Sequence, residues 1–501
     1  MDFIHNLGLA FNIALQPMSL FVCFIGVLIG TLVGVLPGLG SGTAMALLLP
    51  ATLKMSPMDS IIMLAGIYYG TLYGGSTTSI LLNVPGESTS MITCLDGHPL
   101  AKQGRAGAAL GISAIGSFVA GTFSILMLMV LAPILVGVAI KFGPPEFVAI
   151  TFLGLTLVTY LARGSLIKAL MMASVGLLLG CVGLDIMTGE PRFTMKIPKF
   201  EDGVGLLPVM IGLFGISEVL IALEQPFRKR EIFKTKIKDL LPSKQDCKDS
   251  ALPVARGTVV GFFLGLIPGG GGLIASLFSY AIEKGVSKHP EKFGTGAIEG
   301  VAGPETANNA GGGGAFLPLL TLGIPCNVIM AILLGALMLH GVAPGPLLMK
   351  EHPQLFWGVI GSMYIGNIFL LILNLPLIGL WVQILKIPYI ILFPLIFLFT
   401  LVGSYSLNND VSDTMITIVS GVFGYLMKKF DFEPAPLIMA LILGPMFEDA
   451  LRQSLVLSNG SLWIFFSRPI SAVLLLVAIF LLISPVILRV FGKKRPALSD
   501  Y

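Results

Sequence analysis

Long apolar runs recur along the whole chain and constrain its fold more than any other feature. Runs of about 20 residues, enough for a helix to cross the hydrocarbon core of a bilayer, lie at 19–36, 146–162, 165–183, 355–382 and 472–490. Of the 501 residues, 55% are hydrophobic and only 12% are charged, about half the charged share of a soluble domain. So few polar residues cannot cover a water-facing surface. We therefore expect an all-α polytopic membrane protein embedded in the lipid bilayer.

Basic residues are clustered rather than spread. Two clusters stand out: KKR at 493–495, and eight residues between 225 and 250, namely Arg228, Lys229, Arg230, Lys234, Lys236, Lys238, Lys244 and Lys248. Loops rich in Lys and Arg beside membrane spans tend to stay in the cytoplasm, so we interpret both clusters as topology signals and expect no nucleic-acid partner. The first 18 residues contain no Lys or Arg, which predicts a periplasmic start and no cleaved signal peptide.

A Gly-Pro-Gly motif occurs twice, as GVLPGLGSGTA at 34–44 and GLIPGGGGLIA at 265–275. Each copy is followed by a stretch of small and polar residues that leads into an apolar run ending at a proline, at 66–87 and 299–327. The pairing predicts two copies of one unit.

The repeat predicts four parts: a first transmembrane repeat at 1–224, a basic cytoplasmic linker at 225–250, a second transmembrane repeat at 251–455, and a C-terminal transmembrane helix with a basic tail at 456–501. The first copy begins without basic residues, whereas the second follows the cytoplasmic linker. The two copies therefore start on opposite sides of the membrane. This predicts inverted repeats with broken helices or re-entrant hairpins, a plan that secondary transporters use.

Proline and glycine within an apolar segment predict broken helices, and non-helical backbone in a membrane is tolerated only inside protein or along a cavity. A break frees backbone N–H groups at the start of the next half-helix, where the helix dipole favours an anion. We therefore predict a substrate site that combines glycine backbone with hydroxyl and amide groups: Gly38, Gly40, Ser41, Thr43, Ser76, Thr77, Thr78, Asn83, Gly269, Gly270 and Gly271.

The second copy carries more oxygen acceptors, beginning with PETANNAGGGG at 304–314. Carboxylate and amide oxygens suit a hard cation, and an ionisable residue within a membrane is a functional candidate by default. The predicted ion-coupling residues are Glu305, Asn308, Asn309, Thr321 and Asn327, with Na⁺ near Asn308 and Asn309 or a proton on Glu305. The alternative is that both asparagines cap a half-helix while Glu305 faces water at its mouth.

The sequence contains no pattern typical of an enzyme, such as a nucleophile elbow, a Walker A loop or a zinc motif. Its five cysteines are isolated, which predicts neither disulfides nor a metal centre, and we expect no cofactor besides a coupling ion, Na⁺ or H⁺. The three tryptophans, Trp357, Trp381 and Trp463, are candidates for an aromatic belt at the membrane surface. Two classes of function remain: a secondary transporter for an anion, and an anion channel or pore-forming subunit.

Several longer motifs resemble the large membrane subunit of the tripartite tricarboxylate transporter family: GVLPGLGSGTAMALLLP, YGGSTTSILLNVPGE, LDGHPLAKQGRAG, GLIPGGGGLIASLFSYAIEK, and EGVAGPETANN followed by LTLGIPCN. The resemblance implies a permease of the bacterial inner membrane that works with a small membrane subunit and a periplasmic solute-binding protein. It further implies uptake of carboxylates such as citrate, driven by an ion gradient. One departure is GGGG at 311–314, where the family pattern has more alanine and other small residues.

Overall fold

The computed structural model describes residues 3–36, 40–161, 165–185, 187–224, 237–385 and 389–490. Within these ranges the chain is almost entirely helical, and two short strands, β1 (Gly183–Leu184) and β2 (Pro191–Arg192), pair antiparallel. Four helices are long and apolar enough to cross a membrane: α2 (Pro17–Val35), α6 (Ala106–Ala139), α17 (Pro353–Asn374) and α21 (Pro434–Leu457). Shorter apolar helices accompany them. The predicted class, an all-α polytopic membrane protein, is confirmed.

The remaining elements fall into a first and a second half of the chain. The first half contains α3 (Ser41–Thr52), α4 (Pro57–Leu82), η1 (Ser88–Ser90), α5 (Thr93–Lys102), α7 (Pro144–Leu161), α8 (Leu166–Gly180), η2 (Pro198–Asp202), α9 (Leu206–Ile211), the π-helical turn η3 (Gly212–Ile216) and α10 (Ser217–Glu224). The second contains η4 (Ile237–Leu240), α11 (Lys244–Gly265), α12 (Gly271–Val286), η5 (Pro290–Lys292), α13 (Glu299–Gly314), α14 (Phe316–Leu322), α15 (Val328–Leu339), α16 (Leu348–Glu351), α18 (Ile378–Ile384), α19 (Tyr389–Asn408) and α20 (Val411–Lys429). Helix α1 (Phe3–Ala14) precedes the first series, and α22 (Ile464–Ser467) and α23 (Pro469–Val490) follow the second.

The helices break at both Gly-Pro-Gly motifs, as predicted. Helix α2 ends at Val35 and α3 begins at Ser41, while α11 ends at Gly265 and α12 begins at Gly271. Helix α3 then runs back along α4: its first backbone N–H, at Ser41, binds Glu87 beyond the end of α4, and its last carbonyl, at Thr52, accepts from Ser60 near the start. In the second half α12 likewise packs on α13, and we call each break, with the helix that follows it, a re-entrant turn.

Glycines at every fourth position lock α2 against α4. A Cβ atom on Gly26, Gly30 or Gly34 would clash with the backbone carbonyl oxygens of Met63, Ile67 and Thr71 in turn. Because both series of residue numbers rise together, the two helices run parallel. This spacing of small residues lets membrane helices approach at backbone distance.

The second half repeats the seam. Added Cβ atoms on Gly257, Gly261 and Gly265 of α11 would meet the backbone carbonyls of α13 at residues 303, 307 and 311. We call these two contacts the glycine seams. Since the same four-residue spacing and the same parallel direction recur, the two halves share one architecture.

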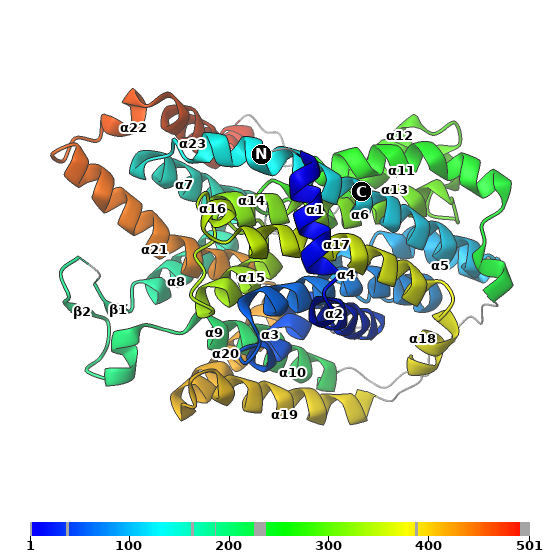
Figure 1. Ribbon diagram of the computed structural model, residues 1–501, viewed down its shortest axis with the longest axis horizontal. Helices are drawn as coiled ribbons and strands as arrows, with labels where there is room; N and C mark the ends of the chain where they lie inside the picture. The colour runs from blue at the N-terminus through cyan, green and yellow to red at the C-terminus, as the bar shows by residue number, and fades with distance from the viewer. Residues whose placement is uncertain are drawn as a thin grey trace.

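The halves also interlock. Helix α6 packs on α13 of the second half, while α17 of the second half packs on α4 of the first. Helix α8 lies against α21, and α20 lies against α9 and η3. Figure 1 shows α21 beside α7 and α8 at the left of the view. Reciprocal contacts of this kind indicate an approximate two-fold relation between the halves. The boundaries at 224 and 250, and the orientation of each half in a membrane, remain predictions, and residues 225–236 lie outside the described ranges.

Ion pairs mark the two ends of the helices. One end carries three ion pairs, Arg105–Asp246, Lys428–Glu218 and Lys429–Glu224. We call it the linker end, because α10 ends there and α11 begins there. Arg468–Glu146, Lys199–Asp410 and a network around Asp185 lie at the other end. The side of the membrane on which the linker end lies stays a prediction.

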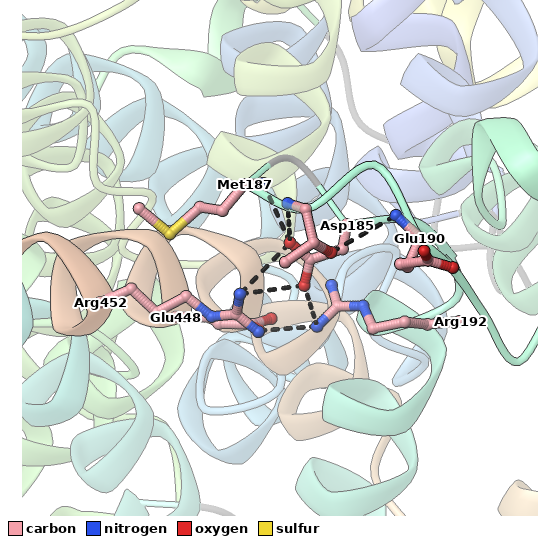
Figure 2. A network of polar contacts seen from close by, with 7 residues as sticks. Asp185, Met187, Glu190, Arg192, Glu448 and Arg452 are labelled. Atoms are coloured by element: carbon pink, nitrogen blue, oxygen red, sulfur yellow. Dashed lines mark hydrogen bonds and ion pairs between the residues drawn. The ribbon is translucent and has the colours of Figure 1, made fainter.

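The β1–β2 hairpin is fixed to α21 by the network in Figure 2. One oxygen of Asp185 accepts the backbone N–H groups of Met187 at 2.9 Å and Thr188 at 3.0 Å, and Arg452 pairs with the same carboxylate at 2.9 Å. Arg192, on β2, pairs with Glu448 at 2.6 Å. These contacts, with the N–H of Thr188 foremost, hold the pKa of Asp185 below its usual value.

Two of the three tryptophans are not at the surface. Trp357 and Trp381 are each 1% exposed, and the indole N–H of Trp381 donates to the carbonyl oxygen of Leu373 at 2.8 Å. The aromatic-belt expectation is therefore wrong for both, because these rings fill the protein core instead of facing lipid head groups. Trp463 is 71% exposed.

Candidate functional site

The first helix break is already bound to a carboxylate of the chain. The backbone N–H of Ser41 donates to Oε2 of Glu87 at 2.6 Å, at the N-terminus of α3. Gly40 is the residue before the helix, and the hydroxyl of Thr43 donates to the carbonyl oxygen of Phe214 at 3.1 Å. Gly38 lies outside the described residues. Of the donors predicted for a ligand here, the Ser41 N–H and the Thr43 hydroxyl are used by the protein itself, whereas the Ser41 hydroxyl has no partner.

The second break depends on glycine backbone. Gly269 and Gly271 have φ angles of 79° and 39°, a region that favours glycine, and a Cβ on Gly270 would clash with the carbonyl of Leu264. The N–H of Gly269 donates to the carbonyl oxygen of Cys326 at 2.8 Å. This bond ties the break to the loop that follows α14.

The polar residues of α4 have different roles. The Ser76 hydroxyl donates to the carboxylate of Glu305, whereas that of Thr78 donates to the carbonyl oxygen of Val35 at 2.7 Å and so holds α4 to the end of α2. Thr77 is buried, and Asn83 ends the helix in the left-handed conformation with its side chain exposed. Only Ser76 reaches the predicted ion site.

Glu305 lies at the junction of the two halves. It is 1% exposed on α13 and accepts hydrogen bonds from Ser76 on α4 and Thr93 on α5, both from the first half. The amide of Asn309 donates to the Ser117 hydroxyl at 2.7 Å and to the Glu305 carbonyl at 3.0 Å. The alternative in which Glu305 faces water therefore disagrees with its burial.

Asn308 is the unusual member of this group. It is 0% exposed, and neither its amide nitrogen nor its amide oxygen has a hydrogen-bond partner. Its amide oxygen lies where a Cβ on Gly272, at the start of α12, would stand. A buried amide without partners costs about 1–3 kcal/mol, which makes Asn308 a candidate ligand-binding residue.

The last two predicted ion residues are bound elsewhere. The Thr321 hydroxyl donates to the carbonyl oxygen of Leu317 at 2.6 Å within its own helix. Asn327 caps α15 by accepting the N–H of Met330 at 2.9 Å. Of the predicted five, Asn309 donates to the backbone of Glu305, and Asn308 precedes Asn309 on the same helix.

Sequence reasoning missed Glu87, Thr89, Thr93 and Ser117. Glu87 had a usable signal in the sequence, since VPGE at 84–87 follows α4 in the first half and IPCN at 324–327 follows α14 in the second. Glu87 is 7% exposed, and no ion pair joins it or Glu305 to a Lys or Arg within the described ranges. Two buried carboxylates therefore lie near the breaks without a fixed cation.

A small cavity adjoins Asn309. Its volume is about 20 Å³, room for about one water molecule. Tyr69, Tyr73 and Asn367 line it, and the Tyr73 hydroxyl donates to the side-chain oxygen of Asn367 at 2.8 Å. The Tyr69 hydroxyl has no partner. The polar region around Glu305 thus continues between α4, α6, α13 and α17.

A sequence model described as the tripartite tricarboxylate transporter TctA family matches residues 20–439, which include both breaks and both glycine seams. The chain belongs to the TctA family. It is a membrane component of a family of transporters rather than of enzymes, and the resemblance inferred from its motifs is confirmed.

Two relatives come from Agrobacterium vitis. The "uncharacterized 52.8 kDa protein in TAR-I ttuC' 3'region" is 49% identical over 479 residues, 96% of this chain and 95% of the relative. The "uncharacterized protein in TAR-II ttuC' 3'region" is 51% identical over 228 residues, 45% of this chain and 94% of the relative. No solved structure matches the chain.

Proposed function

We propose that this TctA-family chain is the permease subunit of a three-component importer of di- and tricarboxylates in the bacterial inner membrane. A small membrane subunit and a periplasmic solute-binding protein are its proposed partners, and citrate is a candidate substrate. Support comes from the family description, which specifies a tripartite system and tricarboxylates, and from the apolar helices that form the fold.

The observation that carries the proposal is the set of buried polar atoms without partners around the helix breaks. They are the Ser41 hydroxyl, the Thr89 hydroxyl and both polar atoms of the Asn308 amide. They come from both halves of the chain. Since each such atom is costly when unpaired, a carboxylate that accepts from the two hydroxyls and from the Asn308 amide nitrogen would offset the cost at these three donors.

The second part of the proposal is coupling to Na⁺ or H⁺. Glu87 and Glu305 are buried without an ion-pair partner among the described residues, and an anionic substrate would add further negative charge. A cation or proton bound at Glu305, beside the oxygens of Ser76 and Thr93, would offset that charge. Binding of ion and substrate would then strengthen each other.

A carrier fits the geometry better than the alternative, an anion channel or pore. At each break a backbone N–H group is bonded to a neighbouring element: that of Ser41 to Glu87, and that of Gly269 to the carbonyl oxygen of Cys326. A channel requires a continuous polar path, whereas a carrier keeps its site occluded in some states.

Uptake into proteoliposomes tests the proposal. The chain would be reconstituted with the small membrane subunit, and [¹⁴C]citrate or [¹⁴C]succinate would be supplied with the binding protein under an inward Na⁺ or pH gradient. We expect saturable uptake that requires both the binding protein and one of the gradients. Flux that does not saturate and ignores the binding protein would instead support a channel.

A further inference from the structure

The two helix breaks carry opposite electrostatic features. At the first, the chain supplies its own carboxylate to the N-terminus of α3 through the Glu87–Ser41 bond of 2.6 Å. A Cβ on Gly40 would stand 3.7 Å from each carboxylate oxygen, so both oxygens lie at the tip of the turn. Helix N-termini favour anions, and this one already has an internal anion.

Among the residues that the structure describes, no carboxylate is hydrogen-bonded to the second break. The residue of its loop that is equivalent to Glu87 is Asn327, and the side chain of Asn327 caps α15 instead. The N-terminus of α12 therefore receives no anionic group from that loop.

Two unpartnered side chains lie at the start of α12. The Asn308 amide, fully buried and without hydrogen bonds, faces Gly272, the second residue of the helix. The methyl group of Thr89 lies 3.2 Å from the position of a Cβ on Gly272, and the Thr89 hydroxyl has no partner either. The atoms that face Gly272 are the Asn308 oxygen and the Thr89 methyl group, and each side chain also carries a neutral hydrogen-bond donor, the Asn308 amide nitrogen and the Thr89 hydroxyl.

We propose that the breaks have unequal roles: a substrate carboxylate binds at the N-terminus of α12 through Asn308 and Thr89, while Glu87 keeps the N-terminus of α3 occupied by the protein. This rests on the proposed function for the identity of the ligand as a carboxylate. It assigns Asn308 to the substrate instead of the coupling ion, which is left to Glu305 and its hydroxyl partners. It also explains why a glycine stands at 272, because a side chain there would collide with Asn308.

Thiol labelling tests the charge preference of each break without any transport substrate. In a cysteine-free background, Thr89→Cys and Gly40→Cys would be treated with methanethiosulfonates carrying either a sulfonate or a trimethylammonium group. We expect Thr89→Cys to react about tenfold faster with the anionic reagent, and Gly40→Cys to prefer the cationic one. In the double variant Gly40→Cys with Glu87→Gln, we expect the thiol to lose its preference for the cationic reagent. The same preference at both cysteines, or no reaction at Thr89→Cys, overturns the proposal.

Citrate uptake tests the role of Asn308. Asn308→Ala is expected to raise the KM for citrate about tenfold while the Na⁺ concentration for half-maximal uptake stays as in the parent. Asn374→Ala, a buried asparagine on α17 with its side-chain nitrogen bonded to Leu370, is the matched control and keeps the parent KM. An unchanged KM in Asn308→Ala, at parent levels in the membrane, overturns the assignment. Absence of citrate and succinate uptake in the parent would contradict the proposed function, and the labelling result would still decide which break attracts anions.

Discussion

The two halves of this protein share a backbone plan but differ in side-chain chemistry. Both contain a glycine seam, a re-entrant turn and a Pro-containing loop that meets the turn. The first half places Glu87 at its turn and contributes hydroxyls, whereas the second contributes Glu305, Asn308 and Asn309. The comparison indicates that the glycines give both halves the same helix packing, while the polar residues near the turns differ between the halves.

Orientation gives the largest expected effect, because labelling is all or none. If the halves are inverted, a single cysteine replacing His5 reacts with a membrane-impermeant maleimide from the periplasm, and native Cys247, which is exposed at the linker end, reacts only after the cytoplasmic side is opened. Labelling of both cysteines from one side would contradict the inversion.

Because the two glycine seams have the same geometry, we expect a bulky substitution in either seam to destabilise the fold equally. Gly30→Val and Gly261→Val each force a side chain into the backbone of a neighbouring helix, at a cost of about 3 kcal/mol or more. We expect little folded protein from either, as measured by yield and melting temperature in detergent. Gly285→Ala, with no atom within 4 Å of the new Cβ, is the control and stays folded. A tolerated valine in one seam alone would show that the seams are not equivalent.

We expect the ion dependence of uptake to rest on Glu305 and Asn309, which both belong to the second half. In the double variant Glu305→Gln with Asn309→Ala, we expect the Na⁺ or H⁺ concentration for half-maximal uptake to rise about tenfold, with citrate affinity falling most at low ion concentration. If these residues only cap a helix, the variant loses stability but responds to the ions as the parent does. Uptake measured across Na⁺ and pH series separates the two outcomes.

Asp96 connects the two halves, and we expect its substitution to cause a moderate loss of stability. One of its oxygens accepts the N–H groups of Gly294, Gly296 and Ala297 at 2.8–2.9 Å, and the other accepts the Tyr280 hydroxyl at 2.9 Å. Asp96→Ala leaves these donors unpaired and is expected to cost about 3 kcal/mol. Asp96→Asn keeps one acceptor oxygen and costs less. Equal melting temperatures for both variants and the parent would mean that this contact does not hold the halves together.

The smallest effect is expected at the β1–β2 hairpin. The pKa of Asp185 is lowered in the folded state, so its contribution to stability is present above its unfolded pKa of about 3.9 and is lost as the pH falls through the lower folded value. Asp185→Asn should therefore lower the melting temperature slightly at pH 7, and the gap to the parent should close as the pH falls below about 4. A gap that persists at low pH would point to lost packing instead of lost charge.

Much of the fold could be predicted from the sequence because its signals are local. The apolar runs predicted the class, and the two Gly-Pro-Gly motifs predicted the positions of both breaks, since glycine and proline disrupt a helix wherever it packs. Glu305 and Asn309 were found because polar residues are rare in apolar segments. The buried tryptophans were mispredicted because the same side chain suits a core and a membrane surface.

The sequence by itself determined that this chain is a helical membrane protein and predicted two related halves, and its longer motifs were enough to indicate the family. Only the tertiary structure decided which donors at the breaks remain free. The Ser41 N–H is taken by Glu87 and the Ser76 hydroxyl by Glu305, whereas Asn308 is left without a partner. Glu87 is 46 residues from Ser41, and Glu305 is 229 residues from Ser76. Hydrogen bonds between such distant residues depend on how the helices pack, and a local pattern contains no information about that packing.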